Sequence, residues 1–183
     1  MMRSAAQRGL TVAIRHKCFL SYHHADQAAV RSFIDTFDTN HDVFISRAIA
    51  MPDDVINSNN PDYIMSRIRD LYLSTSTVTI VLVGGCTWAR KFVDWELQAS
   101  LRQPAGGFPN GLMAVLLNKT ATQGRLPDRV KLNYDSGYAK FYPYPSGPAT
   151  LSGWIDDAFN ARTALANLIR NPRDRKLNNS QCP

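Results

Sequence analysis

Residues 77–85 read TVTIVLVGG, and this stretch decides the fold. The run is apolar and rich in β-branched side chains, and it ends in two glycines. Such a run predicts a strand that is covered on both faces, as strands are in the middle of a parallel sheet. We therefore expect residues 77–85 to form the central strand of an α/β fold.

Other predicted strands and helices alternate along the chain on both sides of this strand. Short apolar runs predict further strands at residues 17–22, 43–46 and 112–117 and near 138–142. Apolar residues at helical spacing, or helix start signals, predict helices from residue 26, from residue 61, at 91–102 and at about 152–169. This alternation indicates an α/β fold, with a parallel sheet of about five strands and helices on both faces.

The second of these helices has a clear start signal. Asn60 offers a capping side chain, and Pro61 suits the first helical position. The spacing of the apolar residues after it predicts that Ile64, Ile68 and Leu71 face the core.

The net charge of +6 on the 183-residue chain comes from its two ends. Residues 1–17 carry four basic and no acidic side chains, and residues 170–176 carry four basic and one acidic. The body between them is nearly neutral, which argues against a nucleic-acid partner, because a nucleic-acid groove needs basic charge on the body of the domain. We expect a flexible basic extension at 1–16, a single domain at 17–171 and a flexible tail at 172–183.

The cysteines and histidines show no metal-binding or disulfide pattern. Cys18, Cys86 and Cys182 contain no CxxC pair, so we expect reduced, buried thiols in a cytoplasmic protein. The four histidines have neither the HExxH motif nor a zinc-site spacing, and we expect no metal site. No apolar run approaches the roughly 20 residues of a membrane span, so no membrane partner is expected.

Three polar segments are expected to meet at one edge of the sheet. They follow three predicted strands and comprise residues 21–26 (SYHHAD), 46–54 (SRAIAMPDD) and 84–96 (GGCTWARKFVDWE). In open parallel sheets the functional site lies at the carboxyl ends of the strands, where such segments converge. The motifs GxGxxG and GxxxxGK[ST] are missing, which argues against a redox dinucleotide site and a P-loop.

The first and third segments resemble a known family. KCFLSYHHAD at residues 17–26 and FVDWEL at 92–97 resemble the TIR domain, specifically the TIR-like proteins of bacterial Thoeris anti-phage defence systems. The resemblance implies a flavodoxin-like, TIR-type fold over about residues 17–171. It also implies cleavage of the nicotinamide–ribose bond of NAD, with NAD as the substrate and no cofactor. Many TIR domains have tryptophan-cysteine before the catalytic glutamate, where this chain has Phe92-Val93.

By this resemblance, Glu96 is the catalytic residue. It is the only glutamate of the chain, on the helix predicted at 91–102. Cleavage develops oxocarbenium character at the ribose, which a nearby carboxylate stabilises. The alternative from the residues alone is an ordinary carboxylate near the start of a helix. The predicted substrate-binding residues are Ser21, Tyr22, His23, Asp26, Trp88 and Phe92.

Several of these residues have a structural alternative. Tyr22 and Trp88 can serve as aromatic packing, and His23 as a surface histidine. Asp26 is most simply the N-cap of the helix that follows it. Arg90 and Lys91, at the start of a helix, can contact a pyrophosphate or act as plain surface charges.

The resemblance also implies partners. NAD-derived cyclic or modified ADP-ribose is expected to diffuse to a separate effector protein, after self-association or a phage-derived trigger activates the enzyme. The loop around Met51 resembles the place where TIR domains associate with one another. One alternative is a non-catalytic adaptor that signals by self-association, and another is a flavodoxin-like binder of a nucleotide or phosphorylated ligand.

Overall fold

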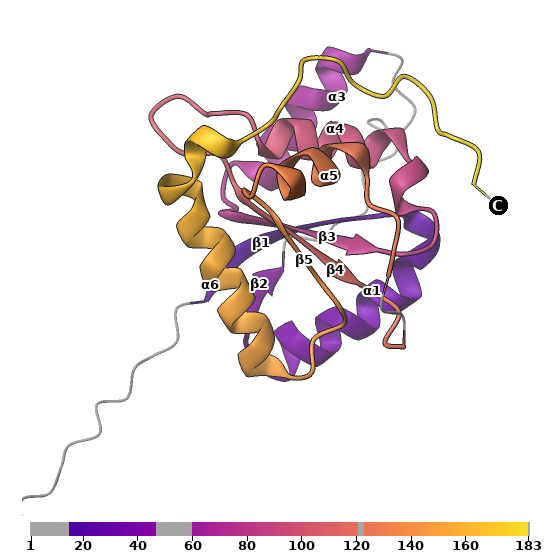
Figure 1. Cartoon of the computed structure of the whole chain (residues 1–183), viewed down its shortest axis with the longest axis vertical. Coiled ribbons are helices and arrows are strands. Elements are labelled where there is room, and N and C mark those ends of the chain that lie inside the picture. The colour runs from indigo at the N-terminus through magenta and orange to yellow at the C-terminus, as the bar shows by residue number, and fades with distance from the viewer. Residues whose placement is uncertain (1–14, 47–59, 121–122, 183) are drawn as a thin grey trace, which may run out of the picture.

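The computed structural model describes residues 15–46, 60–120 and 123–182. In these residues, five parallel strands form one sheet in the order β2-β1-β3-β4-β5 (Figure 1). The strands are β1 (His16–Tyr22), β2 (Phe44–Ser46), β3 (Val78–Val83), β4 (Gly111–Leu116) and β5 (Lys140–Tyr142). The direction of strand order reverses between β1 and β3, which is where open α/β sheets place their sites. The predicted flavodoxin-like, TIR-type α/β fold is confirmed.

Helices cover both faces of this sheet. One face carries α1 (Gln27–Ile34) and α6 (Pro148–Ala164), and the other carries α4 (Lys91–Ser100) and α5 (Asp128–Asp135). The helix α3 (Pro61–Ile68) packs on α4. Shorter helical turns are η1 (His24–Asp26), η2 (Asp35–Thr39), η3 (Arg69–Leu73), η4 (Thr87–Ala89) and η5 (Ala166–Leu168).

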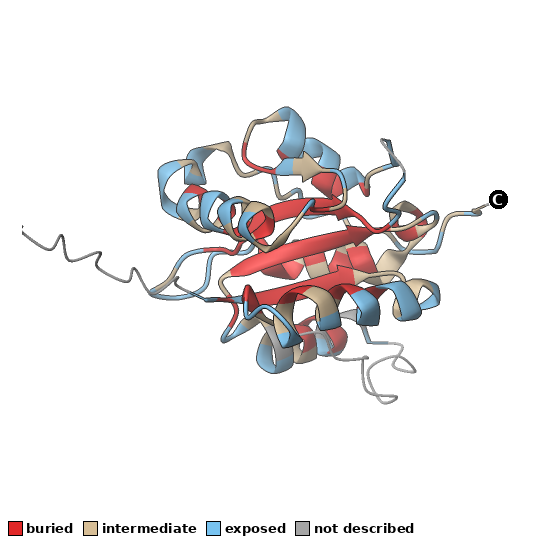
Figure 2. Cartoon of the chain, turned by 90° about the horizontal axis from the view of Figure 1, so that it is seen from below, coloured by how far each residue is buried: buried red, intermediate tan, exposed pale blue. Residues whose placement is uncertain are grey.

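The strand β3 is buried along its whole length, as TVTIVLVGG predicts. Ile80 and Leu82 point into the core beneath α1 and α6, whereas Val81 and Val83 point into the core beneath α4 and α5. Figure 2 shows the sheet buried between helices whose outer surfaces are exposed. A strand with two apolar faces is stable only in such a three-layer arrangement.

The helix α3 begins as predicted but ends differently. The Asn60 side chain accepts a hydrogen bond of 3.2 Å from the Tyr63 backbone N–H. Ile64 and Ile68 are buried, but Leu71 is 39% exposed, so its predicted core position is wrong. Residues 69–73 wind as a π-helix. Because a π-turn contains more residues than an α-turn, Leu71 no longer falls on the inner face.

One helix, α5 (Asp128–Asp135), was not predicted from the sequence. The helix α5 lies between β4 and β5, where the sequence predicts no helix. Its buried residues are Arg129, Val130 and Asn133, of which two are polar. Apolar periodicity therefore gives no signal for this helix.

The C-terminal tail lies along α4, contrary to the expectation of a flexible segment (Figure 1). Trp95 Nε1 donates a 2.8 Å hydrogen bond to the Lys176 carbonyl, and the Lys176 N–H donates one of 2.8 Å to Asp94. The Ser180 N–H donates to the Ala89 carbonyl at 2.8 Å. Residues 172–182 are thus held by polar contacts with α4 and with the turn before it. Residues 1–14 and 183 lie outside the described residues, and the domain bounds 17 and 171 stay predictions.

A buried arginine anchors the first part of this tail. Arg129 is 3% exposed and pairs with Asp94, with Nε 3.0 Å from Oδ1. Its other nitrogens donate to the Asn171 side chain and to the carbonyls of Pro172 and Asp174, at 2.8 to 2.9 Å. The charge of Arg129 is therefore both paired and fully hydrogen-bonded, as a buried cation requires.

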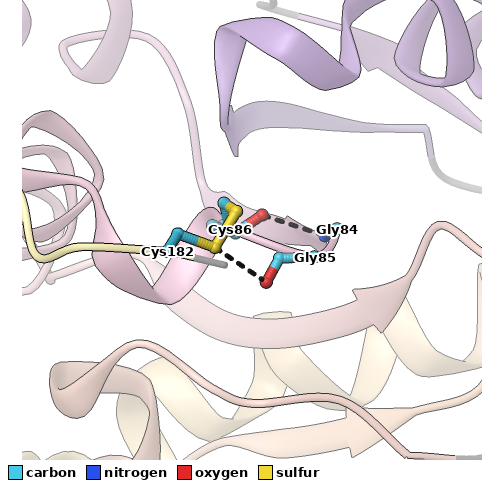
Figure 3. The surroundings of a disulfide bond; sticks show 5 residues. Gly84, Gly85, Cys86 and Cys182 are labelled. Carbon is cyan, nitrogen blue, oxygen red and sulfur yellow. Dashed lines mark hydrogen bonds between the residues drawn. A yellow bond between two sulfur atoms is a disulfide. The ribbon is translucent and has the colours of Figure 1, made fainter.

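The end of the tail is joined covalently to the loop after β3. Cys86 and Cys182 form a disulfide, next to Gly84 and Gly85 (Figure 3). The prediction of reduced thiols is wrong for these two cysteines. The reason is tertiary, because the tail brings together residues 96 positions apart. Cys18 is a free, buried thiol, as predicted, and burial raises its pKa well above the usual range.

No described helix is long and apolar enough to cross a membrane.

Candidate functional site

Ser21 and Glu96 meet at the carboxyl edge of the sheet. Ser21 lies near the end of β1 and pairs in register with Val81, so both side chains point toward α4. On α4, Val93 and Leu97 pack onto the sheet, which places Glu96 beside this apolar stripe. The Ser21 hydroxyl donates a hydrogen bond of 2.6 Å to Glu96 Oε2. This length is typical of a hydroxyl bound to a carboxylate.

The surroundings of the Glu96 carboxyl favour its neutral form. Burial raises the pKa of Glu96 to about 8, and the hydrogen bond from Ser21 opposes this rise. The Ser21 side chain is fully buried, whereas Glu96 keeps part of its surface exposed. A carboxyl with a strongly raised pKa at the edge of a sheet is typical of a functional site. It can give up its proton when a positive charge arrives beside it.

Tyr22 lies next to this pair at the end of β1. Its ring is half-buried and packs against the core beneath α1 and α6. Burial raises the pKa of Tyr22, and the negative charge of Glu96 raises it further. The phenol therefore stays protonated at neutral pH and is close enough to Glu96 to sense its charge.

Asp26 reaches the same edge from the start of α1. Its carboxylate lies against Gly84, the first residue after β3, and a Cβ atom on Gly84 would overlap with it. Its Oδ2 atom is buried with no hydrogen-bond partner in the part of the chain that the structure describes. The N-cap interpretation is wrong for the side chain, since Asp26 makes no capping hydrogen bond to α1. An unsatisfied buried carboxylate oxygen is rare in folded proteins, and this one lies packed against the Gly84 backbone.

Arg90 adds a positive charge to this edge, and His23 adds an imidazole whose environment favours the neutral form. His23 is half-buried, and burial lowers its pKa, with the charge of Arg90 lowering it further. Arg90 directly precedes α4, and its buried Nε has no hydrogen-bond partner among the described residues. A guanidinium beside a helix start suits a phosphate group.

Trp88 and Phe92 are engaged in packing within the protein. The Arg125 guanidinium lies over the Trp88 ring, 3.3 Å from its centroid. The centroids of the Phe92 and Trp95 rings lie 5.5 Å apart. Phe92 also packs against the apolar side chains that α3 and α4 bury between them. A substrate ring that stacks on Trp88 would have to share the indole ring with Arg125. No motif or spacing in the sequence predicts the contact between Arg125 and Trp88. The substrate contacts of Trp88 and Phe92 stay predictions.

Of the second predicted segment, residues 46–54, only Ser46 is described, at the end of β2, and Met51 lies outside the described residues. In the described ranges, no three His, Cys, Asp or Glu side chains gather closely enough to hold a metal ion.

The family profile described as "Thoeris protein ThsB, TIR-like domain" matches residues 19–122 of the chain. The chain belongs to this family. The match spans more than half of the chain, and both Ser21 and Glu96 of this Thoeris TIR-like protein lie within it. None of the curated proteins compared with the chain matches it.

Proposed function

We propose that this TIR-like protein cleaves the nicotinamide–ribose bond of NAD and makes a cyclic or otherwise modified ADP-ribose as a second messenger in anti-phage defence. The observation that carries the proposal is the hydrogen bond of 2.6 Å between Ser21 and Glu96, which holds a partly buried carboxyl group at the C-terminal ends of the strands. The family match supports the setting in Thoeris defence.

Glu96 acts on the charge that moves during cleavage. The nicotinamide ring of NAD is cationic, so its approach favours the ionised form of Glu96. When the bond between the ribose carbon and the ring nitrogen breaks, the electron pair goes to nicotinamide, and positive charge develops on the ribose. The Glu96 carboxylate stabilises that charge, and Ser21 holds the carboxylate in place. Water, or a nucleophilic atom of the ADP-ribose itself, then attacks the ribose carbon, and attack by the latter gives a cyclic product.

The remaining polar groups at this edge suit the rest of NAD. Arg90 and His23 supply cationic or hydrogen-bonding groups for the pyrophosphate. Asp26 lies at the same edge, against Gly84, and is the proposed contact for a ribose hydroxyl. Tyr22, at the end of β1 and near enough to Glu96 to sense its charge, is the proposed border of the site on the side of α1.

The test is mass spectrometry of small molecules from cells that express the wild type, Glu96→Gln or Asp128→Asn, with and without phage infection. Asp128 is an exposed acid in the first turn of α5, so it controls for an ordinary helix carboxylate. We expect an ADP-ribose-like species with the wild type and Asp128→Asn that is absent with Glu96→Gln. If the three extracts match during infection and all three proteins protect, Glu96 is not catalytic.

The second candidate is a non-catalytic adaptor that signals by self-association. The observation in its favour is Phe92-Val93, where many TIR domains have tryptophan-cysteine. The two functions predict different partners. An enzyme acts on a separate effector through its diffusible product after a phage-derived trigger, whereas an adaptor binds its effector directly in the absence of any nucleotide.

A further inference from the structure

A cavity of about 420 Å³ lies between η3, the C-terminal part of α4 and the C-terminal tail. Three arginines line it, namely Arg69 in η3, Arg102 just beyond α4, and Arg173 in the tail. Gln98 and Asn171 add two side-chain amides, and no acidic residue lines the cavity. Its size is that of a site for a small molecule.

The three arginines have no carboxylate partner within the described ranges. No ion pair there involves Arg69, Arg102 or Arg173. Like charges gathered around one hollow repel one another, although solvent screens part of this repulsion because Arg102 and Arg173 are exposed. A bound anion relieves this repulsion. Guanidinium groups bind phosphate through paired hydrogen bonds, so phosphate is the anion that three arginines suit best.

The wall that carries Arg173 is already fixed in place. Gln98 Nε2 donates to the carbonyls of Pro172 at 3.1 Å and Arg173 at 2.8 Å. In return, Asn171 Nδ2 donates to the Gln98 carbonyl at 3.1 Å. The tail is thus docked on α4 at the cavity, and a ligand need not order it on binding.

A second cavity of about 560 Å³ adjoins the first and shares Arg69 and Arg102 with it. It is also lined by one carboxylate, Asp70, and by a further arginine, Arg162, so its lining remains net positive. Its lining includes the hydroxyl residues Ser74 and Thr75 and the ring of Phe108, which is 50% exposed. Hydroxyl groups can bind a sugar, and an exposed aromatic ring can stack on a base. The two cavities together therefore offer groups for phosphate, sugar and base.

We propose that these two adjoining cavities bind a nucleotide, with its phosphates on Arg69, Arg102 and Arg173. This site is distinct from the one at Glu96. The helix α4 runs from the carboxyl edge of the sheet toward its amino edge, and Arg102 lies beyond its far end. Gln98 also lies about 200° around the helix from Glu96. The inference does not depend on the proposed function.

The test is isothermal titration calorimetry of the full chain with ADP and with adenosine. We expect ADP to bind and adenosine to bind at least about tenfold more weakly, because charged hydrogen bonds to phosphate are lost. The double variant Arg69→Gln/Arg173→Gln is expected to weaken ADP binding by a similar factor. Lys140→Gln, which removes one exposed charge from β5, serves as the control and should leave the affinity unchanged.

Three results would overturn the proposal. The first is the absence of ADP binding by the wild-type chain, whether or not that chain binds an oligonucleotide or a poly-glutamate peptide. The second is a double variant that binds ADP as the wild type does. The third is an equal loss in Lys140→Gln, which would indicate only general attraction to a basic protein. Should the double variant not fold, as judged by circular dichroism, Arg102→Gln replaces it with the same expectation.

Discussion

The hydroxyl of Ser21 and the carboxyl of Glu96 lie 2.6 Å apart, although 75 positions separate them in the sequence. One residue comes from β1 and the other from α4, and the order of the sheet places β1 beside β3, whose following loop leads into α4. The contact therefore joins the two segments that resemble the TIR family. It also gives the only glutamate of the chain an environment unlike that of a solvated helix carboxylate.

The hydrogen bond from Ser21 should set the pH dependence of NAD cleavage. Burial raises the pKa of Glu96 to about 8, and the bond from Ser21 holds it below what burial alone would give. In Ser21→Ala, the pKa of Glu96 is expected to rise by about one unit or more. The rate of nicotinamide release should then rise with pH around a midpoint that is higher by the same amount. Ser100→Ala is the matched control, since Ser100 is also buried but donates to the Leu97 carbonyl. A profile that does not move in Ser21→Ala would argue against the ionised Glu96 as the active form.

Glu96 should also make the stability of the fold depend on pH. Its pKa in the folded chain, about 8, lies above the ordinary value of 4.5. The folded state therefore binds more protons than the unfolded state between these values, and the free energy of unfolding falls as pH rises through this window. The slope is at most about 1.4 kcal/mol per pH unit. Urea unfolding from pH 5 to 9 should show this fall for the wild type and a flatter curve for Glu96→Gln. Parallel curves would mean that Glu96 titrates normally.

Gly84 should be required for the position of Asp26. A side chain at Gly84 overlaps with the Asp26 carboxylate, whereas a Cβ atom on the neighbouring Gly85 meets nothing within 4 Å. We expect Gly84→Ala to lose about 1–3 kcal/mol of stability and most NAD cleavage, because Asp26 must move. Gly85→Ala should retain both. Urea unfolding and nicotinamide release measure the two effects, and equal behaviour of the two variants would exclude a role for this contact.

The disulfide should stabilise the docked tail. Cys86 and Cys182 close a loop with a sequence separation of 96, and breaking such a link typically costs about 2–4 kcal/mol. Dithiothreitol should therefore lower the thermal midpoint of the wild type. It should not change that of the double variant Cys86→Ser/Cys182→Ser, whose midpoint is expected to match the reduced wild type. If dithiothreitol leaves the thermal midpoint of the wild type unchanged, hydrogen bonds alone hold residues 172–182.

Most of the sheet could be predicted from the sequence because its signals are local. The apolar run at 77–85 is enough to predict a central strand, and Glu96 follows from its place after that strand. In contrast, α5 buries Arg129 and Asn133, so its pattern does not look like that of a buried helix. Leu71 was misplaced because the π-turn in η3 changes the period of the helix.

The features that the sequence did not reveal are contacts between distant segments. The tail docks through Arg129 and Trp95, and the disulfide links Cys182 to Cys86. The position of Arg125 over Trp88 is of the same kind. None of these pairs has a spacing or motif that marks it, because a single sequence records only which residues are present and not which of them meet.

The most direct test of the proposed role of Glu96 is the titration of its carboxyl group. Glu96 is the only glutamate, so the chain made by cell-free synthesis with carboxyl-labelled ¹³C-glutamate gives one glutamate carboxyl signal. Its chemical shift, followed by NMR over a range of pH, should titrate with a midpoint of about 8, and bound NAD should lower that midpoint because its nicotinamide ring is cationic. A midpoint near the ordinary 4.5 that NAD does not move would contradict the assignment of Glu96 to the ribose.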